Sequence, residues 1–258
     1  TTDGSKTLYI TGAGATLPVN AHVRKVVITT SEDLTIGSGK SIIVEEDIDN
    51  DGTITVEVGG SLVQNHSGVN ANSGSGSYVV KQTGFNANTD YNIWSSPILN
   101  ANIVSTFTSV NACDVFAIDG SSQKWKYDFL TGTNYDCNGN SVTFSAGEVL
   151  TDQANDGIMN TGRGYFVPGN TADTREFSGA INDGDLTIPI YGNNVIGTPA
   201  VDWILADQNL VGNPYPSGLD LSTFWTANNS NLQGGVHFYD HTLGAYVTWT
   251  SGGGTGPD

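Results

Sequence analysis

Short apolar runs separated by turn-forming residues fill the first third of the chain. The runs are rich in β-branched side chains, and Gly, Asn and Asp stand between them. They occupy residues 26–28, 34–36, 42–44, 53–56 and 62–63. No helical period is present, so the pattern predicts short β-strands from about residue 6 to residue 82.

Two of these segments repeat with a spacing of 20 residues. Residues 35–41 read TIGSGKS and residues 55–61 read TVEVGGS, so Gly39 matches Gly59 and Ser41 matches Ser61. Such a period with β-formers in register is typical of a β-solenoid. We expect a short, right-handed-type solenoid of about two to three rungs. A degenerate rung at residues 15–23 is expected to cap one end, and the following domain to cover the other.

The rest of the chain contains a second internal repeat. The tripeptide STF at 105–107 recurs at 222–224, and the blocks on either side align as well. Each copy predicts a strand, a proline turn, a short helix or loop, and a hairpin. The predicted hairpin tips are residues 119–120 and 241–244.

The second copy lacks the continuation that follows the hairpin of the first. Strands are predicted at 162–167, 176–179 and 186–190, whereas the sequence stops soon after Trp249. We expect the second copy to be incomplete, because the chain was cut or because a partner supplies strands by strand addition. We thus predict an all-β fold with a short β-solenoid, a β-sandwich unit and a partial second unit. Their predicted ranges are 1–85, 86–205 and 206–258.

Composition and charge limit the classes of partner. The formal net charge is −17, with nine Lys and Arg, so a phosphate backbone would be repelled and nucleic-acid binding is not expected. Charged residues are 14 % of the chain, and its polarity comes from Asn, Thr, Ser and Gly, as in extracellular all-β proteins. No apolar run approaches the ~18 residues of a membrane span. Because the sequence begins at Thr1, it is interpreted as a processed or trimmed product.

Four sequence blocks carry a resemblance to a known family. The blocks are Leu-Thr-Ile at 34–36 with Gly-Lys at 39–40 and Asn-Asp-Gly-Thr at 50–53, Tyr-Asn-Ile-Trp-Ser-Ser-Pro at 91–97, Gly-Arg-Gly-Tyr at 162–165, and Asn-Leu-Val-Gly-Asn-Pro-Tyr-Pro-Ser at 209–217. In this order they resemble secreted modular surface proteins of Bacteroidetes-type bacteria, over nearly the whole chain. The resemblance implies export by the type IX route and a secreted or outer-surface location. The resemblance indicates a location and a modular construction of the protein more than it indicates an activity.

The segment Asp47-Ile48-Asp49-Asn50-Asp51-Gly52 resembles the start of a calcium loop. Alternate carboxylates in a tight turn supply the oxygen ligands that calcium prefers, so Asp47, Asp49 and Asp51 are candidate ligands. The acidic residue that an EF-hand would need at position twelve is displaced by one place, to Glu57. The alternative is a solenoid corner in which Asp and Asn satisfy turn geometry. The turn at 182–185 has the same two interpretations.

Cys113 and Cys137 are the two cysteines of the chain. In an oxidising compartment a bridge between them would add roughly 3 kcal/mol to stability. We predict this disulfide, and the alternative is two unpaired buried thiols.

Aromatic residues are the stronger functional candidates. Trp94 and Trp225 lie beside the repeated blocks and are predicted to be core residues. Aromatic residues near the predicted hairpin tips are candidate glycan-stacking residues. They are Trp125, Tyr127, Tyr246 and Trp249. His237 and His241 also lie at a hairpin and are interpreted as surface histidines rather than zinc ligands.

We expect a non-catalytic, secreted cell-surface or extracellular module for adhesion or scaffolding. The sequence contains no GxSxG nucleophile motif and no dinucleotide-binding motif. The first alternative is a glycan-binding accessory module of a polysaccharide-degrading enzyme. The second is a filament subunit completed by a strand from a neighbour. Expected partners are extracellular glycans, neighbouring surface proteins or further copies of the chain, with no required cofactor and calcium as the candidate ion.

Overall fold

The computed structural model describes most, but not all, of the 258 residues. For 124–127 and 253–257 the description covers the backbone alone. The described residues are 3–69, 71–84, 91–108, 110, 114–120, 124–127, 157–169, 174–192, 208–232, 235–240, 242–250 and 253–257.

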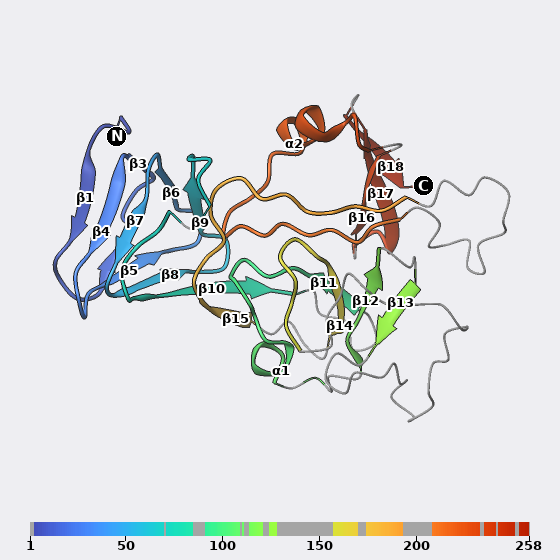
Figure 1. The fold of residues 1–258 in the computed structure, drawn as a ribbon, viewed down its shortest axis with the longest axis horizontal. Coiled ribbons are helices and arrows are strands. Elements are labelled where there is room, and N and C mark those ends of the chain that lie inside the picture. The colour runs from blue at the N-terminus through green and yellow to red at the C-terminus, as the bar shows by residue number, and fades with distance from the viewer. Residues whose placement is uncertain are drawn as a thin grey trace, which may run out of the picture. The chain divides into compact units, whose positions relative to one another are not determined.

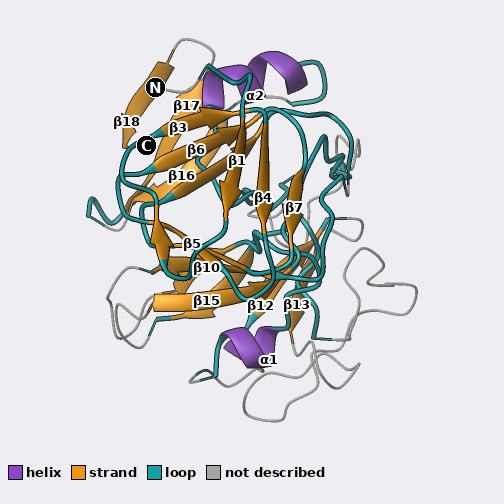
Figure 2. Ribbon diagram, turned by 90° about the vertical axis from the view of Figure 1, so that its left-hand side faces the viewer, coloured by secondary structure: helices purple, strands orange, loops and turns teal. Residues whose placement is uncertain are grey.

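The first part of the chain is a β-solenoid with three parallel faces (Figure 1). Its ten strands are β1 (Thr7–Ile10), β2 (Ala15–Thr16), β3 (Ala21–Val23), β4 (Lys25–Ile28), β5 (Asp33–Ile36), β6 (Ser41–Val44), β7 (Ile48–Asn50), β8 (Thr53–Val56), β9 (Ser61–Gln64) and β10 (Ser77–Thr83). The three faces carry the orders β1-β4-β7, β2-β5-β8-β10 and β3-β6-β9. Figure 2 shows these sheets around the solenoid interior, seen from the end that carries β1.

The 20-residue repeat of the sequence is the strand register of the structure. Thr35 pairs with Thr55 between β5 and β8, and Ser41 pairs with Ser61 between β6 and β9. At the matching corners Gly39 and Gly59 have φ of 70° and 78°, a left-handed conformation that glycine adopts without a Cβ penalty. The predicted solenoid and its register are confirmed.

Alternating burial holds the rungs together. In β4, β5, β6 and β8 every second residue is buried, and these side chains meet in one continuous core. Ile36, Ile42 and Val44 have no exposed surface. Because side chains of a strand alternate between two faces, the β-branched residues point into the solenoid and their neighbours point out.

The solenoid has about four turns, more than the two or three that the sequence predicts. The residues from Ala15 to Val23, expected to form a degenerate cap, belong to a full first rung that also contains β1. Its offsets to the second rung are 18, 19 and 21 residues on the three faces, and β8 pairs with β10 at an offset of 24. These unequal offsets conceal the outer rungs from a search for one period.

Later segments cover the end of the solenoid that carries β10, as the sequence predicts. Strand β15 (Thr174–Gly179) pairs antiparallel along its whole length with residues 78–83 of β10. On another face, the Leu62 N–H of β9 donates to the Pro216 carbonyl oxygen at 2.9 Å. On the third, Ser73 forms a parallel bridge with Asp49.

Two antiparallel sheets follow the solenoid within the described residues. One has the order β11-β14-β12-β13 and the other β16-β17-β18. The strands and helices are β11 (Tyr91–Trp94), α1 (Ile103–Thr106), β12 (Phe116–Asp119), β13 (Lys124–Tyr127), β14 (Tyr165–Pro168), α2 (Leu221–Asn228), β16 (Val236–Asp240), β17 (Ala245–Thr250) and β18 (Gly253–Pro257). The fold is therefore all-β with two short helices among the described residues, as predicted.

The second internal repeat is visible as a short helix followed by a hairpin. Helix α1 precedes the hairpin β12–β13, and helix α2 precedes the hairpin β16–β17. Each helix begins at a side-chain cap: Asn102 accepts the N–H of Val104 and Ser105, and Asp220 accepts the N–H of Thr223. Both segments therefore have a short helix followed by a hairpin, as the sequence predicts, and the assignment of two repeat units stays a prediction.

The chain divides into two compact units, residues 1–217 and 218–258. The first contains the solenoid and the sheet β11-β14-β12-β13, and the second contains α2 and β16-β17-β18. The predicted boundaries near residues 85 and 205 fall outside the described residues. Among those residues no helix is long and apolar enough to cross a membrane.

Two neighbouring isoleucines test the inward alternation. Ile42 is fully buried, whereas the adjacent Ile43 of β6 is partly exposed. We predict that Ile42→Ala lowers the free energy of unfolding by about 2–5 kcal/mol, because it leaves a cavity between rungs. Ile43→Ala is the matched control and should cost clearly less. Urea unfolding followed by circular dichroism measures both, and equal losses would contradict the assigned register.

Candidate functional site

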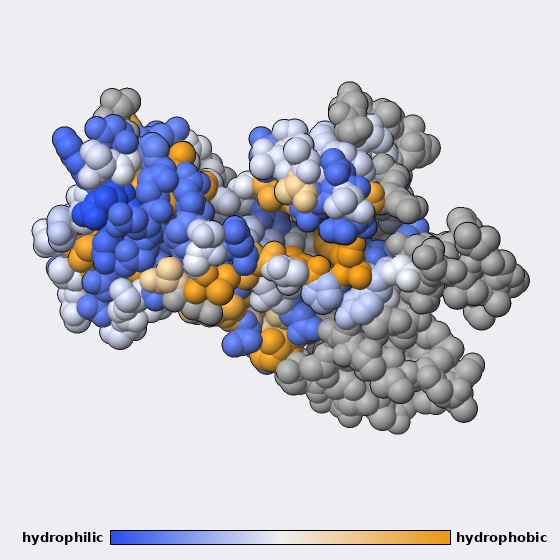
Figure 3. All heavy atoms as spheres, turned by 45° about the horizontal axis from the view of Figure 1, so that its top comes forward, coloured by the Kyte–Doolittle hydropathy of each residue, from blue (hydrophilic) through white to orange (hydrophobic). Residues whose placement is uncertain are grey.

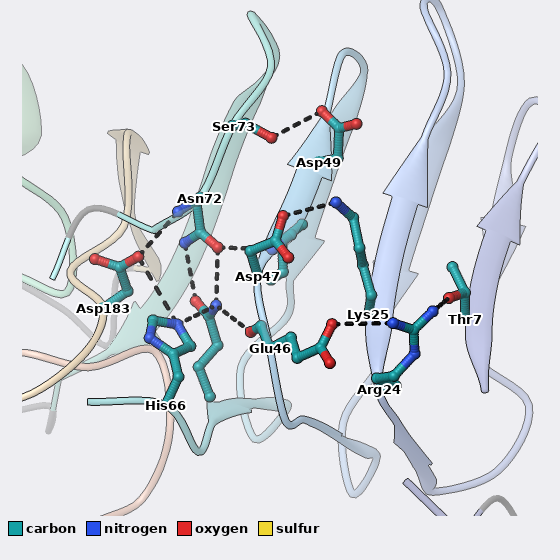
Figure 4. A network of polar contacts seen from close by, with 12 residues as sticks. Thr7, Arg24, Lys25, Glu46, Asp47, Asp49, His66, Asn72, Ser73 and Asp183 are labelled. Carbon is teal, nitrogen blue, oxygen red and sulfur yellow. Dashed lines mark hydrogen bonds and ion pairs between the residues drawn. The ribbon is translucent and has the colours of Figure 1, made fainter. Parts of the chain in front are cut away.

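Polar side chains on the outside of the solenoid form contacts from rung to rung (Figure 4). Arg24 donates to Thr7 Oγ1 at 2.9 Å on one side and to Glu46 Oε2 at 3.2 Å on the other. Lys25 Nζ lies 2.7 Å from Asp47 Oδ2, and this carboxylate raises the pKa of the Lys25 ammonium group. Because each pair joins adjacent rungs, the contacts fix the stacking register.

His22 and Glu45 continue the same pattern on a neighbouring face. The His22 ring contacts the Glu45 carboxylate, which also accepts the Asn65 side-chain N–H at 3.1 Å. The contact with His22, and to a smaller extent the one with Asn65, holds the pKa of the Glu45 carboxyl group below its usual range. In Figure 3 hydrophilic side chains cover much of the solenoid surface in view.

The three aspartates predicted as calcium ligands have separate partners. Asp47 pairs with Lys25, whereas Asp49 Oδ1 accepts the Ser73 hydroxyl at 3.0 Å. Asp51 Oδ1 accepts both the N–H and the hydroxyl of Ser75, at 2.9 and 3.1 Å. Within the described part of the chain, no three His, Cys, Asp or Glu side chains group as a metal site. Asp47 lies just before β7, Asp49 within it and Asp51 just after it, and calcium binding there stays a prediction.

A buried carboxylate, Asp183, ties the exit of the solenoid to the segment after β15. Its Oδ2 accepts the backbone N–H groups of Ala71 and Asn72 at 2.9 and 3.2 Å, and its side chain is 2 % exposed. His66 Nε2 lies 3.9 Å from the same oxygen. Burial raises the pKa of the nearby Tyr78 hydroxyl, and the Asp183 charge raises it further. Asp183 thus acts as a clamp on the chain that leaves the solenoid.

The Asn-Leu-Val-Gly-Asn-Pro-Tyr-Pro-Ser block packs against two other segments of the first unit. The N–H of Gly164 donates to Leu210 O, and that of Gly212 donates to Gly162 O, both at 3.0 Å. The Asn182 side chain donates to Pro214 O at 2.8 Å, and the Tyr215 hydroxyl donates to Gly184 O at 2.7 Å. These contacts give the block a structural role.

Two of the hollows on the described surface of the first unit have polar linings. One, of about 420 Å³, is lined by acidic side chains and His66. The other, of about 380 Å³, lies beside α1 and β15 and is lined by Asn, Ser and Thr side chains and Glu176. Neither contains an arrangement of nucleophile, base and orienting group that would identify a catalytic centre.

The second unit presents aromatic side chains on the hairpin β16–β17. Tyr239 and Tyr246 are directly opposite each other in the register, with ring centroids 5.3 Å apart and planes at 73°. They are 38 % and 50 % exposed. His237 and Thr248 form the next pair on this face, joined by a 2.8 Å contact between Nδ1 and Oγ1. We call these four residues the tyrosine face.

The opposite face of the hairpin carries Trp249. Its ring contacts Trp225 of α2 edge to face, at 5.8 Å between centroids. Tyr246 and Trp249, both predicted as glycan-stacking residues, therefore lie on opposite faces and do not form one platform. Trp94 is buried as predicted, at 7 % exposure, but the prediction that Trp225 is a core residue was wrong, since α2 has no buried side chain.

Other predicted residues lie outside what the structure describes. The backbone of Trp125 and Tyr127 is placed in β13, but their side chains are not described. Cys113 and Cys137 lie outside the described residues, so the disulfide stays a prediction, and His241 lies outside as well.

Sequence reasoning missed two residues that matter here. Tyr239 could have been found from hairpin pairing, because a four-residue tip places it opposite Tyr246. Asp183 is 111 residues from Asn72, and no local pattern signals this contact.

The clamp can be tested at the amides that it holds. Asp183→Ala should destabilise the exit of the solenoid by about 1–3 kcal/mol, because it leaves the Ala71 and Asn72 N–H groups without their acceptor. Hydrogen exchange at these two amides should become faster. Asp185→Ala is the control, since Asp185 is exposed. Unchanged exchange in Asp183→Ala would contradict the clamp.

The helix cap of the second unit predicts a pH dependence. The Thr223 N–H, and then the Ser222 hydroxyl, lower the pKa of Asp220. A lowered folded-state pKa means that this stabilisation of α2 is present above the unfolded pKa and is lost as the pH falls through the folded value. NMR titration should show Asp220 ionising below the ordinary Asp range and α2 signals changing with it. A titration at the ordinary value would contradict the cap.

Comparison with known proteins identifies the family without an assigned activity. Neither the curated proteins nor the solved structures contain a match to the chain. A family model described as a domain of unknown function, DUF8693, matches residues 5–251. The match spans nearly the whole chain, which therefore belongs to the DUF8693 family.

Proposed function

We propose that this chain is a non-catalytic module of a secreted or surface-exposed protein, with a role in adhesion or scaffolding. The observation that carries the proposal is the tyrosine face. Aromatic side chains that are 38 % and 50 % exposed on a sheet are the kind of group that forms the energetic centre of a binding surface.

The hairpin is suited to hold this face in a fixed geometry. The cross-strand ring contact orients Tyr239 and Tyr246 against each other, and the third strand β18 supports β17 from the far side. At the tip, Asp240 Oδ1 accepts the N–H groups of Thr242 and Leu243 at 2.7 and 3.1 Å. A partner would therefore meet rings whose conformational freedom is already restricted, which lowers the entropic cost of binding.

The solenoid supports a scaffolding role. Its rungs are joined by buried aliphatic side chains inside and by ion pairs outside, so it resists bending between neighbouring rungs. A stacked β-structure of this kind is a suitable rigid spacer.

Glycan binding is the second candidate, and the composition of the tyrosine face favours it. The C–H face of a sugar ring stacks on an aromatic ring, while phenol, imidazole and hydroxyl groups donate and accept hydrogen bonds. Tyr239 and Tyr246 supply rings, and the exposed His237 supplies polar atoms on the same face, where the buried Thr248 hydroxyl contacts its Nδ1. The perpendicular rings fit one sugar unit at a corner better than a flat polysaccharide surface.

A binding panel tests both candidates. The chain is applied to immobilised extracellular polysaccharides and to immobilised surface proteins, and the variants Tyr239→Ala and Tyr246→Ala are compared with wild type. We expect each to weaken binding by about tenfold or more, as for loss of a central aromatic contact. Phe238→Ala is the matched control, because Phe238 is 42 % exposed on the same strand but the opposite face.

The outcomes separate the candidates. Saturable binding to a polysaccharide, lost in the tyrosine variants, supports the glycan role, and binding to a protein surface supports adhesion through protein contacts. Equal binding by wild type and both tyrosine variants contradicts the assigned face. Release of new reducing ends from any bound polysaccharide contradicts the non-catalytic role.

A further inference from the structure

A polar hollow of about 380 Å³ lies beside helix α1 and strand β15, which are neighbours in the fold (Figure 1). We call it the α1 hollow. Its volume falls within the ~300–1,000 Å³ that is typical of small-molecule sites. All the residues that line it belong to the first unit, whereas the tyrosine face belongs to the second, so the two share no residue.

Local structure gathers polar side chains of both elements at the α1 hollow. In β15 the side chain of Phe177 is fully buried, and its neighbours Glu176 and Ser178 line the hollow. Since side chains alternate along a strand, Glu176 and Ser178 leave the sheet on the side opposite to Phe177. Thr106 lies four residues after Asn102, the cap of α1, and this spacing places both on one face of the helical turn.

Several polar groups of the α1 hollow are not used by the protein itself. Thr106 is 8 % exposed, yet no described residue forms a hydrogen bond with its hydroxyl. The Ser178 hydroxyl and the Asn100 carboxamide also have no partner within the described part of the chain. Polar groups that are nine-tenths buried, as Thr106 is, normally have a partner. Their convergence on one hollow is typical of a site for a polar ligand.

The backbone at the start of α1 does not attract the ligand, because its amides already have an acceptor. Asn102 Oδ1 accepts the N–H groups of Val104 and Ser105 at 3.0 and 3.1 Å. The Ser105 hydroxyl donates to Asn102 O at 3.2 Å. What the hollow offers to a ligand is therefore a set of side-chain groups, and not the amides that would favour an anion.

The charges around the α1 hollow disfavour an anionic ligand. None of the described residues that line it is basic. The nearby Lys81 ammonium group is shared between the carboxylates of Glu57 and Glu176, at 3.0 and 3.5 Å, so these surroundings keep a negative charge. An anion would be repelled both here and by the net charge of −17.

The uncharged lining matches a ligand rich in hydroxyl groups. Hydroxyl and carboxamide side chains donate and accept hydrogen bonds, as neighbouring hydroxyls of a sugar do. Ile98 and Ala101, which are both 3 % exposed, supply apolar lining for the C–H groups of a sugar ring. A metal ion would need several oxygen ligands with more charge than one shared carboxylate supplies.

The walls of the α1 hollow are held in fixed positions. The Leu99 N–H donates to Ala180 O at 2.8 Å and ties the segment before α1 to the residue after β15. Phe107, directly after α1, contacts Phe177 of β15 edge to face, with 6.2 Å between ring centroids. Because both walls are ordered without a ligand, binding costs less conformational entropy.

We propose that the α1 hollow binds one unit of a neutral saccharide. The Thr106 and Ser178 hydroxyls and the Asn100 carboxamide form hydrogen bonds with sugar hydroxyls. No aromatic side chain is among the described residues that line the hollow, so hydrogen bonds hold the sugar and ring stacking does not. The inference does not rest on the function proposed above, because it uses no residue of the tyrosine face.

Two-dimensional NMR of the whole chain tests the site, with the methyl glycosides of glucose, galactose, mannose and N-acetylglucosamine as probes. At least one glycoside should shift the amide signals of residues 98–106 and 176–178. Thr106→Val replaces the unpartnered hydroxyl with a methyl group and should weaken binding about three- to tenfold. Thr108→Val is the matched control, because Thr108 is exposed and does not line the hollow.

Two further variants test the shape and the charge of the site. Ser178→Phe places a large ring at an exposed strand position and should block the α1 hollow. Methyl glucuronide should bind more weakly than methyl glucoside, because its carboxylate meets the charge of Glu176. Glu176→Gln should reduce that difference.

Each outcome supports or overturns the site. Glycoside binding that Thr106→Val and Ser178→Phe weaken, with circular dichroism unchanged and Thr108→Val like wild type, supports it. No shift at these amides with any probe at tens of millimolar, or equal binding by wild type and both variants, overturns it. A glucuronide that binds as tightly as the glucoside overturns the neutral ligand class. Binding that is lost in Tyr239→Ala or Tyr246→Ala belongs to the tyrosine face and overturns the α1 hollow alone.

Discussion

Stacking of parallel rungs is the interaction on which the first unit depends. Each rung buries its inward side chains against the next, so an interior rung is covered on two sides and a terminal rung on one. Ile36 and Ile42 show the interior state with no exposed surface, and Leu8 and Ala15 show the terminal state. The contacts at the β10 end follow from this constraint, because β15 and Pro216 cover edges that would otherwise meet water.

Polar contacts on the outer surface of the solenoid specify the register of the rungs more closely than aliphatic packing in the core does. Aliphatic packing tolerates small slips, whereas the pairs Arg24–Glu46 and Lys25–Asp47 are satisfied in one alignment of the rungs. Each exposed ion pair is worth little by itself, about 0–1 kcal/mol. The ion pairs therefore contribute to the choice of register more than to stability. The acidic side chains of residues 45–51 take part in structural contacts of this kind.

The two units differ in how they distribute apolar and aromatic side chains between the interior and the surface. The solenoid directs most of its aliphatic residues inward and presents polar side chains outside, whereas the second unit, with a short helix and three strands, leaves Tyr239 and Tyr246 exposed. Because both units contain a helix followed by a hairpin, their equivalent strands can be compared. In the first unit the equivalent strand β12 pairs with β14 as well as β13, and the helix–hairpin plan is part of a larger sheet.

The sequence by itself determined the solenoid, its 20-residue register and the helix–hairpin repeat, because strand alternation, corner glycines such as Gly39 and helix caps such as Asp220 are local signals. It did not reveal the first and last rungs, whose offsets of 18 to 24 residues follow corner geometry rather than a fixed period. The tertiary structure alone decided that Asp183 clamps the exit turn and that Tyr246 and Trp249 face opposite ways. Contacts between distant segments, and the face that each side chain takes in a hairpin, depend on pairing partners that no local pattern specifies.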